Sequence, residues 1–383
     1  MKCQRDKFNL QRKYAYLNCA YMSPLLKKVE NAGIKGLKSK RKPYQITAED
    51  FFHETEVIRG LFSQLINNPS PDRICIIPSV SYGIANVTNN LPFSDGKILL
   101  VEEQFPSNVY PWLALENKGV EVEFIGPSDS AKKGESWNQK ILEAINTETR
   151  VLAMGHVHWA DGTLFDLEAI RAKLDEVGGL LIIDGTQSVG ALPFDVQKFR
   201  PDALICAAYK WLMGPYAIGL AYYGPAFDNG NPIEHSWMNR VNSEEFSGLV
   251  SYEENFRPLA LRYEVGEHSN FILIPMLHEA LNQLLRWGVT SINNYCEQLM
   301  ADMLPEITGL GYTIENPAFR SPHLFGIRLG NKMDMNEVKN SFARNKVSVS
   351  YRGDAIRVSP HVYNDDLDIR KLLKALKAPI LAS

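Results

Sequence analysis

Three polar side chains with different chemistry follow two apolar runs of this chain. The run Leu180–Ile183 ends on an acid, Asp184, and an amide, Gln187, comes three residues later. A second apolar run, over 203–208, is followed by an amine, Lys210. Both runs have the length and the β-branched residues of buried parallel strands, and parallel α/β sheets carry their chemistry at the carboxyl ends of the strands. We therefore expect an acid, an amide and an amine to meet at one edge of a sheet.

An acid and an amine at one sheet edge suit pyridoxal phosphate. Its aldehyde is held by a lysine Schiff base, and its ring nitrogen is kept protonated by a carboxylate. The order D-x-x-Q at 184–187 and K-W-L-x-G-P at 210–215 resembles the class V aminotransferases and their cysteine desulfurase relatives, of fold type I. The resemblance implies Lys210 as the Schiff-base and proton-transfer residue, Asp184 at the ring nitrogen and Gln187 at the phenolic oxygen of the cofactor.

A phosphate site is expected where residues 78–85 leave a predicted strand and enter a helix. Backbone N–H groups and small hydroxyl residues at a helix N-terminus suit a phosphate dianion. By the resemblance, Val80 and Ser81 occupy two threonine positions of the family, so only Ser81 keeps a hydroxyl. The family also often has a serine three residues before the lysine, and here that residue is Ala207. Some phosphate contacts of the family are therefore absent or replaced.

The resemblance assigns two further cofactor contacts. Phe105 stands where the related desulfurases have a histidine stacked over the pyridine ring, and an aromatic face can stack there without acting as an acid or base. The segment 262–270 resembles one that reaches the phosphate of the neighbouring subunit in dimeric members. Its Gly266 and Asn270 match the family pattern, and His268 or Ser269 is the expected contact.

An arginine near the C-terminal end is expected to bind the substrate. Arg357 matches the family pattern R-x-S-x-x-x-Y-N, whose arginine holds the substrate α-carboxylate. A guanidinium group can grip a carboxylate through two hydrogen bonds. Arg352 is a nearby competitor for this role. No metal site is expected, because His156 and His158 alone make a poor pair of metal ligands.

The elements that position these residues alternate in type along the chain. Apolar strands separated by helical segments predict an α/β fold, with a mostly parallel sheet covered by helices and a smaller α+β C-terminal part. A helix over 47–67 is expected to begin with Thr47 as its N-cap. Further strands are predicted at 74–78, 97–103, 120–126, 151–157, 323–329, 346–351 and 355–359. The predicted division is an N-terminal arm (1–25), a large cofactor-binding domain (26–265) and a small domain (266–383).

Composition sets the broad class of the protein. The 383 residues are 45% hydrophobic and 22% charged, which is typical of a globular protein, and a net charge of −3 gives no reason to expect nucleic acid or membrane partners. No segment is apolar enough for a signal peptide or membrane span, so a cytoplasmic protein is expected. The five cysteines are scattered without a metal-ligand spacing. The resemblance implies a homodimer.

The reaction is less constrained than the cofactor, because fold and cofactor are shared by transaminases, desulfurases, hydrolases and epimerases. Persulfide-forming desulfurases need a cysteine on the loop before the substrate arginine, and 340–356 contains none. An aminotransferase acting on an amino acid and a keto acid is therefore expected. A cysteine or selenocysteine lyase remains an alternative, as does an isopenicillin N epimerase-like enzyme, which 102–112 resembles. A non-enzymatic cofactor-binding protein is least expected, since Asp184, Lys210 and Arg357 are all retained.

Overall fold

The computed structural model describes residues 1–129, 133–330 and 333–381. Its largest element is a seven-stranded sheet with the order β2-β8-β7-β6-β5-β3-β4. Only β8 runs antiparallel to its neighbours; the other paired strands are parallel, as expected from the apolar runs. The strands are β2 (Ile74–Ile77), β3 (Lys97–Val101), β4 (Glu121–Ile125), β5 (Thr149–Gly155), β6 (Leu180–Asp184), β7 (Ala203–Ala207) and β8 (Gly219–Tyr223).

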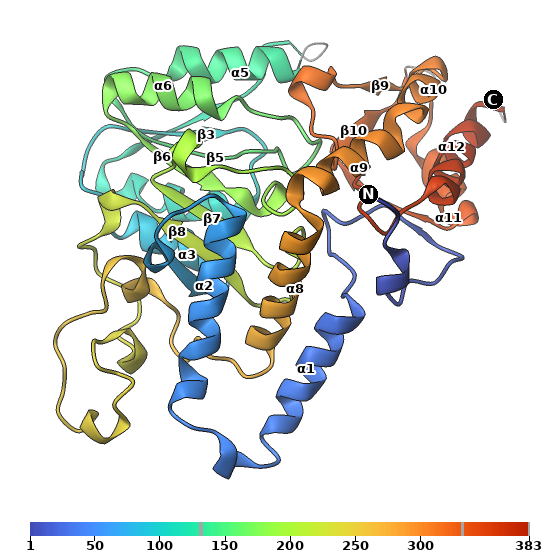
Figure 1. Ribbon diagram of the computed structural model, residues 1–383. Helices are drawn as coiled ribbons and strands as arrows, with labels where there is room; N and C mark the ends of the chain where they lie inside the picture. The colour runs from blue at the N-terminus through green and yellow to red at the C-terminus, as the bar shows by residue number, and fades with distance from the viewer. Residues whose placement is uncertain (130–132, 331–332, 382–383) are drawn as a thin grey trace.

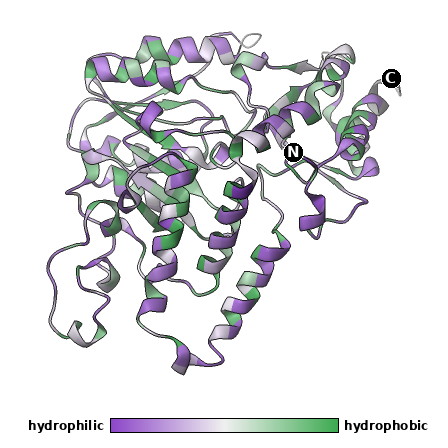
Figure 2. Ribbon diagram, viewed as in Figure 1, coloured by the Kyte–Doolittle hydropathy of each residue, from purple (hydrophilic) through white to green (hydrophobic). Residues whose placement is uncertain are grey.

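Alternate residues of these strands enter two buried clusters, one on each face of the sheet. Ile183 and Leu204 belong to one cluster, whereas Ile182 and Ile205 belong to the other. Figure 2 shows these strands as mainly hydrophobic. Because both faces are covered, the strands are apolar throughout, and polar chemistry is confined to their ends.

Helices cover both faces of the large sheet (Figure 1). One face packs against α1 (Lys27–Ser39), α2 (His53–Leu65), α5 (Lys133–Ala144), α6 (Leu167–Val177) and α8 (Leu273–Trp287), and the other against α3 (Val80–Thr88) and α4 (Tyr110–Leu113). The short α7 (Val196–Phe199) follows β6. α8 packs against α1 and α2 although it lies beyond the expected boundary at 265/266. The exact division into domains stays a prediction.

A second, antiparallel sheet forms the smaller part, with the order β12-β13-β10-β9. Its strands are β9 (Thr313–Ile314), β10 (Phe325–Arg328), β12 (Ser350–Arg352) and β13 (Ala355–Val358), and its helices are α9 (Val289–Ala301), α10 (Met303–Gly309), α11 (Met335–Asn345) and α12 (Asp366–Leu381). The N-terminal arm joins it through β1 (Ala15–Tyr16), which pairs in parallel with β11 (Val347–Ser348). Both chain ends therefore lie beside this part (Figure 1).

The expected helix cap at Thr47 is wrong. The α2 helix begins at His53, after a short 3-10 turn over Glu49–Phe51, and the Thr47 hydroxyl instead donates a hydrogen bond to Asp50 at 3.0 Å. The ring of Phe52 packs edge-on against Trp237. Phe52 is the residue directly before α2, and its φ of −123° lies outside the helical range. Within the described ranges, no helix has both the length and the apolar character needed to cross a bilayer.

Candidate active site

Lys210 lies in the turn between β7 and β8. Its turn is fixed by backbone hydrogen bonds from Gly214 to the Ala208 carbonyl at 2.9 Å and from Ser23 of the arm to the Tyr209 carbonyl at 2.9 Å. Met213 and Ala217 hold left-handed backbone conformations, with φ of 57° and 64°. Such conformations are strained for residues other than glycine and persist where the surrounding structure enforces them. The sequence therefore fixes the lysine on a rigid turn.

Asp184 ends β6, the strand next to β7. Its Oδ1 accepts a hydrogen bond from the backbone N–H of Thr186 at 3.0 Å, and the Thr186 hydroxyl in turn accepts one from the N–H of Ala207 at 3.0 Å. Burial raises the pKa of Asp184, while the Thr186 hydrogen bonds and the nearby Lys210 act against this rise. The neighbouring strand ends thus bring the predicted acid and amine together.

The Lys210 side chain is buried, with 6% of its surface exposed. Burial lowers its pKa to about 8; Asp184 opposes this shift, whereas the positive charges of Arg357 and Arg352 reinforce it. A neutral amine is the form that attacks a carbonyl, and a pKa near 8 makes that form accessible close to physiological pH. The environment of Lys210 is therefore suited to covalent chemistry.

Gln187 is oriented by two partners from distant parts of the chain. Its Oε1 accepts a hydrogen bond from the Trp211 indole at 2.9 Å, and its Nε2 donates to the Ala20 carbonyl at 3.2 Å. The amide nitrogen carries two hydrogens, so one N–H is left to donate elsewhere. The backbone carbonyl of Gln187 faces the ring Nε2 of His323 at 2.7 Å.

Two aromatic rings form a wall beside the lysine. The Lys210 Nζ lies 5.3 Å from the centroid of the Phe105 ring. Phe105 meets Trp159 edge-on, with 5.3 Å between ring centroids, and the Trp159 indole donates to the Glu103 carbonyl at 2.6 Å. The predicted stacking residue therefore does lie next to the lysine.

Val80 and Ser81 open helix α3, which packs against β7. Val80 is buried, Ser81 is exposed, and the preceding Ser79 caps the helix by accepting a hydrogen bond from the Tyr82 N–H at 3.2 Å. The Ser79 and Ser81 hydroxyls lie 3.0 Å apart. Ser79 is not among the residues expected from the sequence, although a serine directly before a helix is a recognisable capping signal.

Arg357 lies on β13 of the second sheet and is only 1% exposed. Its Nη1 donates to the Trp159 carbonyl at 2.7 Å and its Nη2 to the Ser350 hydroxyl at 3.3 Å, while its Nε is buried without a partner. In the described part of the chain, no carboxylate pairs with it. Burial lowers its pKa to about 9, and Arg352 adds to this effect. A buried guanidinium group without an acid is a ready site for an anion.

His268 belongs to a different buried cluster. Its Nε2 lies 3.1 Å from Glu264, without the alignment of a hydrogen bond, and Glu264 also pairs with Arg59 at 2.8 Å. Burial lowers the pKa of His268, against the influence of Glu264. The structure thus gathers Lys210 with most of the predicted residues and leaves His268 apart, so its contact with a partner's phosphate stays a prediction.

Two buried histidines next to the site, His323 and His361, are not among the residues expected from the sequence. His323 and His361 contact the ring of Trp211, with centroid distances of 4.5 and 5.7 Å. Burial lowers their pKa values to about 4 and about 3, so both rings are neutral at physiological pH. No local sequence pattern marks His323, because its contacts with Gln187 and Trp211 join segments that lie far apart in the sequence.

The two histidines considered for a metal lie in separate surroundings. His156 packs against Phe194, whereas Nδ1 of His158 faces Asp161 at 3.2 Å. Across the described residues, no group of three or more histidine, cysteine, aspartate or glutamate side chains is placed to hold a metal ion.

A family model described as aminotransferase class V matches residues 38–374. The chain belongs to this class V family. Among curated relatives, the uncharacterized aminotransferase YcbU of Bacillus subtilis is 26% identical over 333 residues, covering 86% of this chain and 85% of the relative. An uncharacterized aminotransferase of Schizosaccharomyces pombe is 25% identical, covering 86% and 82%. A probable cysteine desulfurase of Methanothermobacter thermautotrophicus is 29% identical, but over only 40% of this chain and 38% of its own.

Solved structures show that this class V chain has fold type I. The apo structure of a cysteine desulfurase from Thermococcus onnurineus NA1 has a TM-score of 0.84 at 19% identity, covering 100% of this chain and 99% of that one. The cystine C–S lyase C-DES, in complex with its reaction product cysteine persulfide, has a TM-score of 0.83 at 18% identity, covering 95% and 97%. At such identities the likeness extends to the fold alone.

Pyridoxal phosphate is the cofactor of this class V enzyme. The residues present fit it. The buried Lys210 has a lowered pKa and lies beside the Phe105 ring and near Asp184 at a strand end. The serine-capped helix α3 packs against β7, the strand that precedes Lys210. These groups would supply the amine, the stacking surface, the acid and the phosphate site that the cofactor requires.

Proposed function

We propose that the chain is an aminotransferase that uses pyridoxal phosphate to move an amino group between an amino acid and a 2-oxo acid. The observation that carries the proposal is the buried Lys210, with a pKa of about 8, near the unpaired Arg357. The lysine can exchange a proton, and the arginine can hold an α-carboxylate in a fixed position. An amino acid anchored between them would present its Cα–H bond to the amine.

The cofactor, when bound, supplies an electron sink for the negative charge left when that bond breaks. Lys210 would hold the cofactor covalently and, once free, carry the proton. Asp184 would keep the ring nitrogen protonated through its negative charge, and Gln187 would donate its remaining N–H to the phenolic oxygen. Phe105 would stack on the ring, while the α3 N-terminus with Val80 and Ser81 would bind the phosphate. A homodimer, in which His268 faces a neighbouring phosphate, and a cytoplasmic location complete the proposal.

The alternative is a lyase that breaks a C–S bond, which the names of similar structures favour. A persulfide route needs a reactive thiol with a low pKa and some exposure. Burial raises the pKa of Cys19 to about 12 and also raises those of Cys75, Cys206 and Cys296. Cys3 is half-buried near the N-terminus. The four buried thiols are therefore unsuited to the persulfide route, and this supports transamination over that route.

The two reactions separate in one experiment. The purified holoenzyme is mixed with single amino acids, and the visible absorbance band of its cofactor is followed. Transamination bleaches the band, releases a 2-oxo acid, and lets an added 2-oxo acid restore the band. Release of sulfide and ammonia from cysteine, with the band unchanged at the end, would instead establish a lyase. No spectral response to any amino acid or 2-oxo acid would refute both.

A further inference from the structure

The two arginines near the site share one face of the small sheet. Strands β12 and β13 pair antiparallel, with Ser350 opposite Arg357 and Arg352 opposite Ala355. Side chains two residues apart on a strand lie on the same face. Arg352 and Arg357 are therefore diagonal neighbours across the strand pair, within reach of each other for side chains of this length.

Both arginines converge on Trp159. The guanidinium carbon of Arg352 lies 5.3 Å from the centroid of the Trp159 ring, and that of Arg357 lies 6.0 Å from it. Trp159 contacts Phe105, beside which the Lys210 amine lies. The two guanidinium groups thus lie close enough to the lysine for their positive charges to act on it.

Neither arginine forms an ion pair in the ranges that the structure describes. Arg352 donates through Nη1 to the Tyr351 carbonyl at 2.7 Å, and its Nε, like that of Arg357, is buried without a partner. Asp161 and Asp354 are engaged elsewhere, because Arg328 pairs with Asp161 at 2.6 Å and with Asp354 at 3.3 Å. Two adjacent cations, one buried and one partly buried, leave positive potential that a ligand with two negative groups would neutralise.

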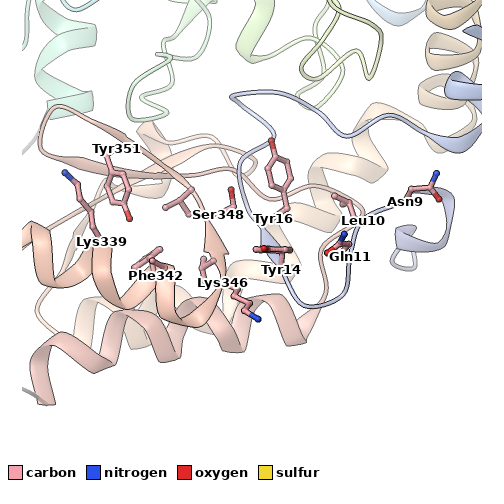
Figure 3. A pocket seen from close by; sticks show the side chains of 13 residues that line it. Asn9, Leu10, Gln11, Tyr14, Tyr16, Lys339, Phe342, Lys346, Ser348 and Tyr351 are labelled. Carbon is pink, nitrogen blue, oxygen red and sulfur yellow. The ribbon is translucent and has the colours of Figure 1, made fainter.

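The opposite face of β12 has a different character. Tyr351 points into a cavity of about 710 Å³ between the arm and the small sheet, where Lys339 lies over its ring at 5.2 Å (Figure 3). Tyr14, Tyr16 and Phe342 line the same cavity. The strand therefore separates this aromatic cavity from the face that carries the two arginines.

We propose that Arg352 binds a second, distal anionic group of the substrate, so that the enzyme takes an amino acid with an acidic side chain and the corresponding 2-oxo diacid. Arg357 then holds the α-carboxylate and Arg352 the far end. This inference rests on the proposed function, because it treats the bound dicarboxylate as a substrate of the aminotransferase. The binding test itself does not require turnover.

The test compares dicarboxylates with monocarboxylates of the same length on the holoenzyme. Succinate and glutarate are titrated against butyrate and pentanoate by calorimetry, with two lengths used to bracket the span between the arginines. The wild-type enzyme should bind a dicarboxylate roughly tenfold to a hundredfold more tightly than its monocarboxylate partner. Arg352→Gln should remove this preference and leave monocarboxylate affinity unchanged. Arg352→Lys should retain part of it, because a lysine keeps the charge but not the planar fork.

Lys339→Gln is the matched control, because it removes a positive charge beside β12 on the opposite face. It should leave the preference intact. Equal affinities in the wild type, or a preference that survives Arg352→Gln, would overturn the inference. Failure of the proposed function looks different: the dicarboxylates bind through Arg352, yet no amino acid changes the cofactor band. If the enzyme turns over neutral amino acids preferentially and binds dicarboxylates no more tightly than monocarboxylates, the proposed function stands and this inference is wrong.

Discussion

Two buried clusters of charge in this molecule differ in whether their charges are matched. In the Glu264 cluster (Glu264, Arg59, His268 and Arg257), the fully buried carboxylate lies 2.8 Å from Arg59 and 3.1 Å from His268. Burial alone would raise the pKa of Glu264, but His268, Arg59 and Arg257 together lower it. In the active-site cluster (Lys210, Asp184, Arg352 and Arg357), no ion pair forms among these described residues.

The difference separates structural from functional charge. A matched buried pair is tolerated because each charge compensates the desolvation of the other, and removing one partner is strongly destabilising. Burial lowers the pKa values of Lys210 and Arg357, and the unmatched positive charges of the neighbouring arginines lower them further. Such a cluster weakens the fold and gains its compensation from a ligand. Substitutions in the two clusters should therefore have opposite signatures.

The largest expected effect is on catalysis. Lys210→Met should lower the transamination rate by about 10²- to 10⁴-fold or more, because the proton-transfer amine is lost. It should leave the apoprotein as stable as the wild type or stabilise it, since a side chain of similar volume replaces a poorly solvated amine. Single-turnover absorbance and thermal melting measure the two effects. The exposed Lys198→Met is the control, and a marked loss of stability in Lys210→Met would contradict the comparison.

In the matched cluster the expected effect is on folding. Glu264→Gln should destabilise the protein by about 3–5 kcal/mol, because Arg59 loses its buried counter-charge. Denaturant unfolding measures the stability, with the exposed Glu116→Gln as the control. Unaltered stability would mean that the Glu264 cluster is not held together by its matched charges.

Arg357→Gln should show the active-site signature more weakly. We expect KM for an amino acid to rise roughly tenfold to a hundredfold, as for a lost charge-assisted hydrogen bond, without a loss of apoprotein stability. Arg357→Lys should restore only part of the affinity. Steady-state kinetics with melting curves provide the check. A KM that stays constant while the melting temperature falls would assign Arg357 a structural role.

The smallest effect concerns protonation of the free lysine. In the apoprotein, the rate of cofactor attachment should rise with pH around a midpoint of about 8, as Lys210 loses its proton. Arg352→Gln should move this midpoint upward and Asp184→Asn should move it downward, because the removed charges act in opposite directions.

The shifted pKa of Lys210 also predicts how the stability of the apoprotein changes with pH. The folded pKa of about 8 lies below the ordinary value of 10.5, so the unfolded chain binds more protons between these limits. The contribution of Lys210 should therefore destabilise the apoprotein fully below pH 8 and disappear as pH rises past 10.5. Stopped-flow mixing and pH-dependent melting test these statements, and a Lys210→Met apoprotein with the same pH profile would contradict the second.

The sequence was most informative for residues whose position could be predicted from the end of a single strand. Asp184 and Lys210 follow continuous apolar runs, and such runs mark buried parallel strands whose ends share an edge. The partnership of Arg352 with Arg357 could not be predicted in the same way, because it depends on the register of β12 against β13. Nor could the start of α2, since Thr47 is a plausible cap and the contact of Phe52 with Trp237 joins segments far apart in the sequence.

The N-terminal arm gives this site an order of assembly. Leu17 accepts a hydrogen bond from the Ser359 N–H, and its carbonyl lies near the Ser359 hydroxyl, 342 residues further along the chain. Ala20, three residues on, contacts both Ser359 and the Gln187 amide. During synthesis these arm residues leave the ribosome long before β13 exists, and contacts so distant in sequence form late. The large sheet can therefore form early in synthesis. The contacts of the arm around Gln187 and Arg357 can form only after nearly the whole sequence has been translated.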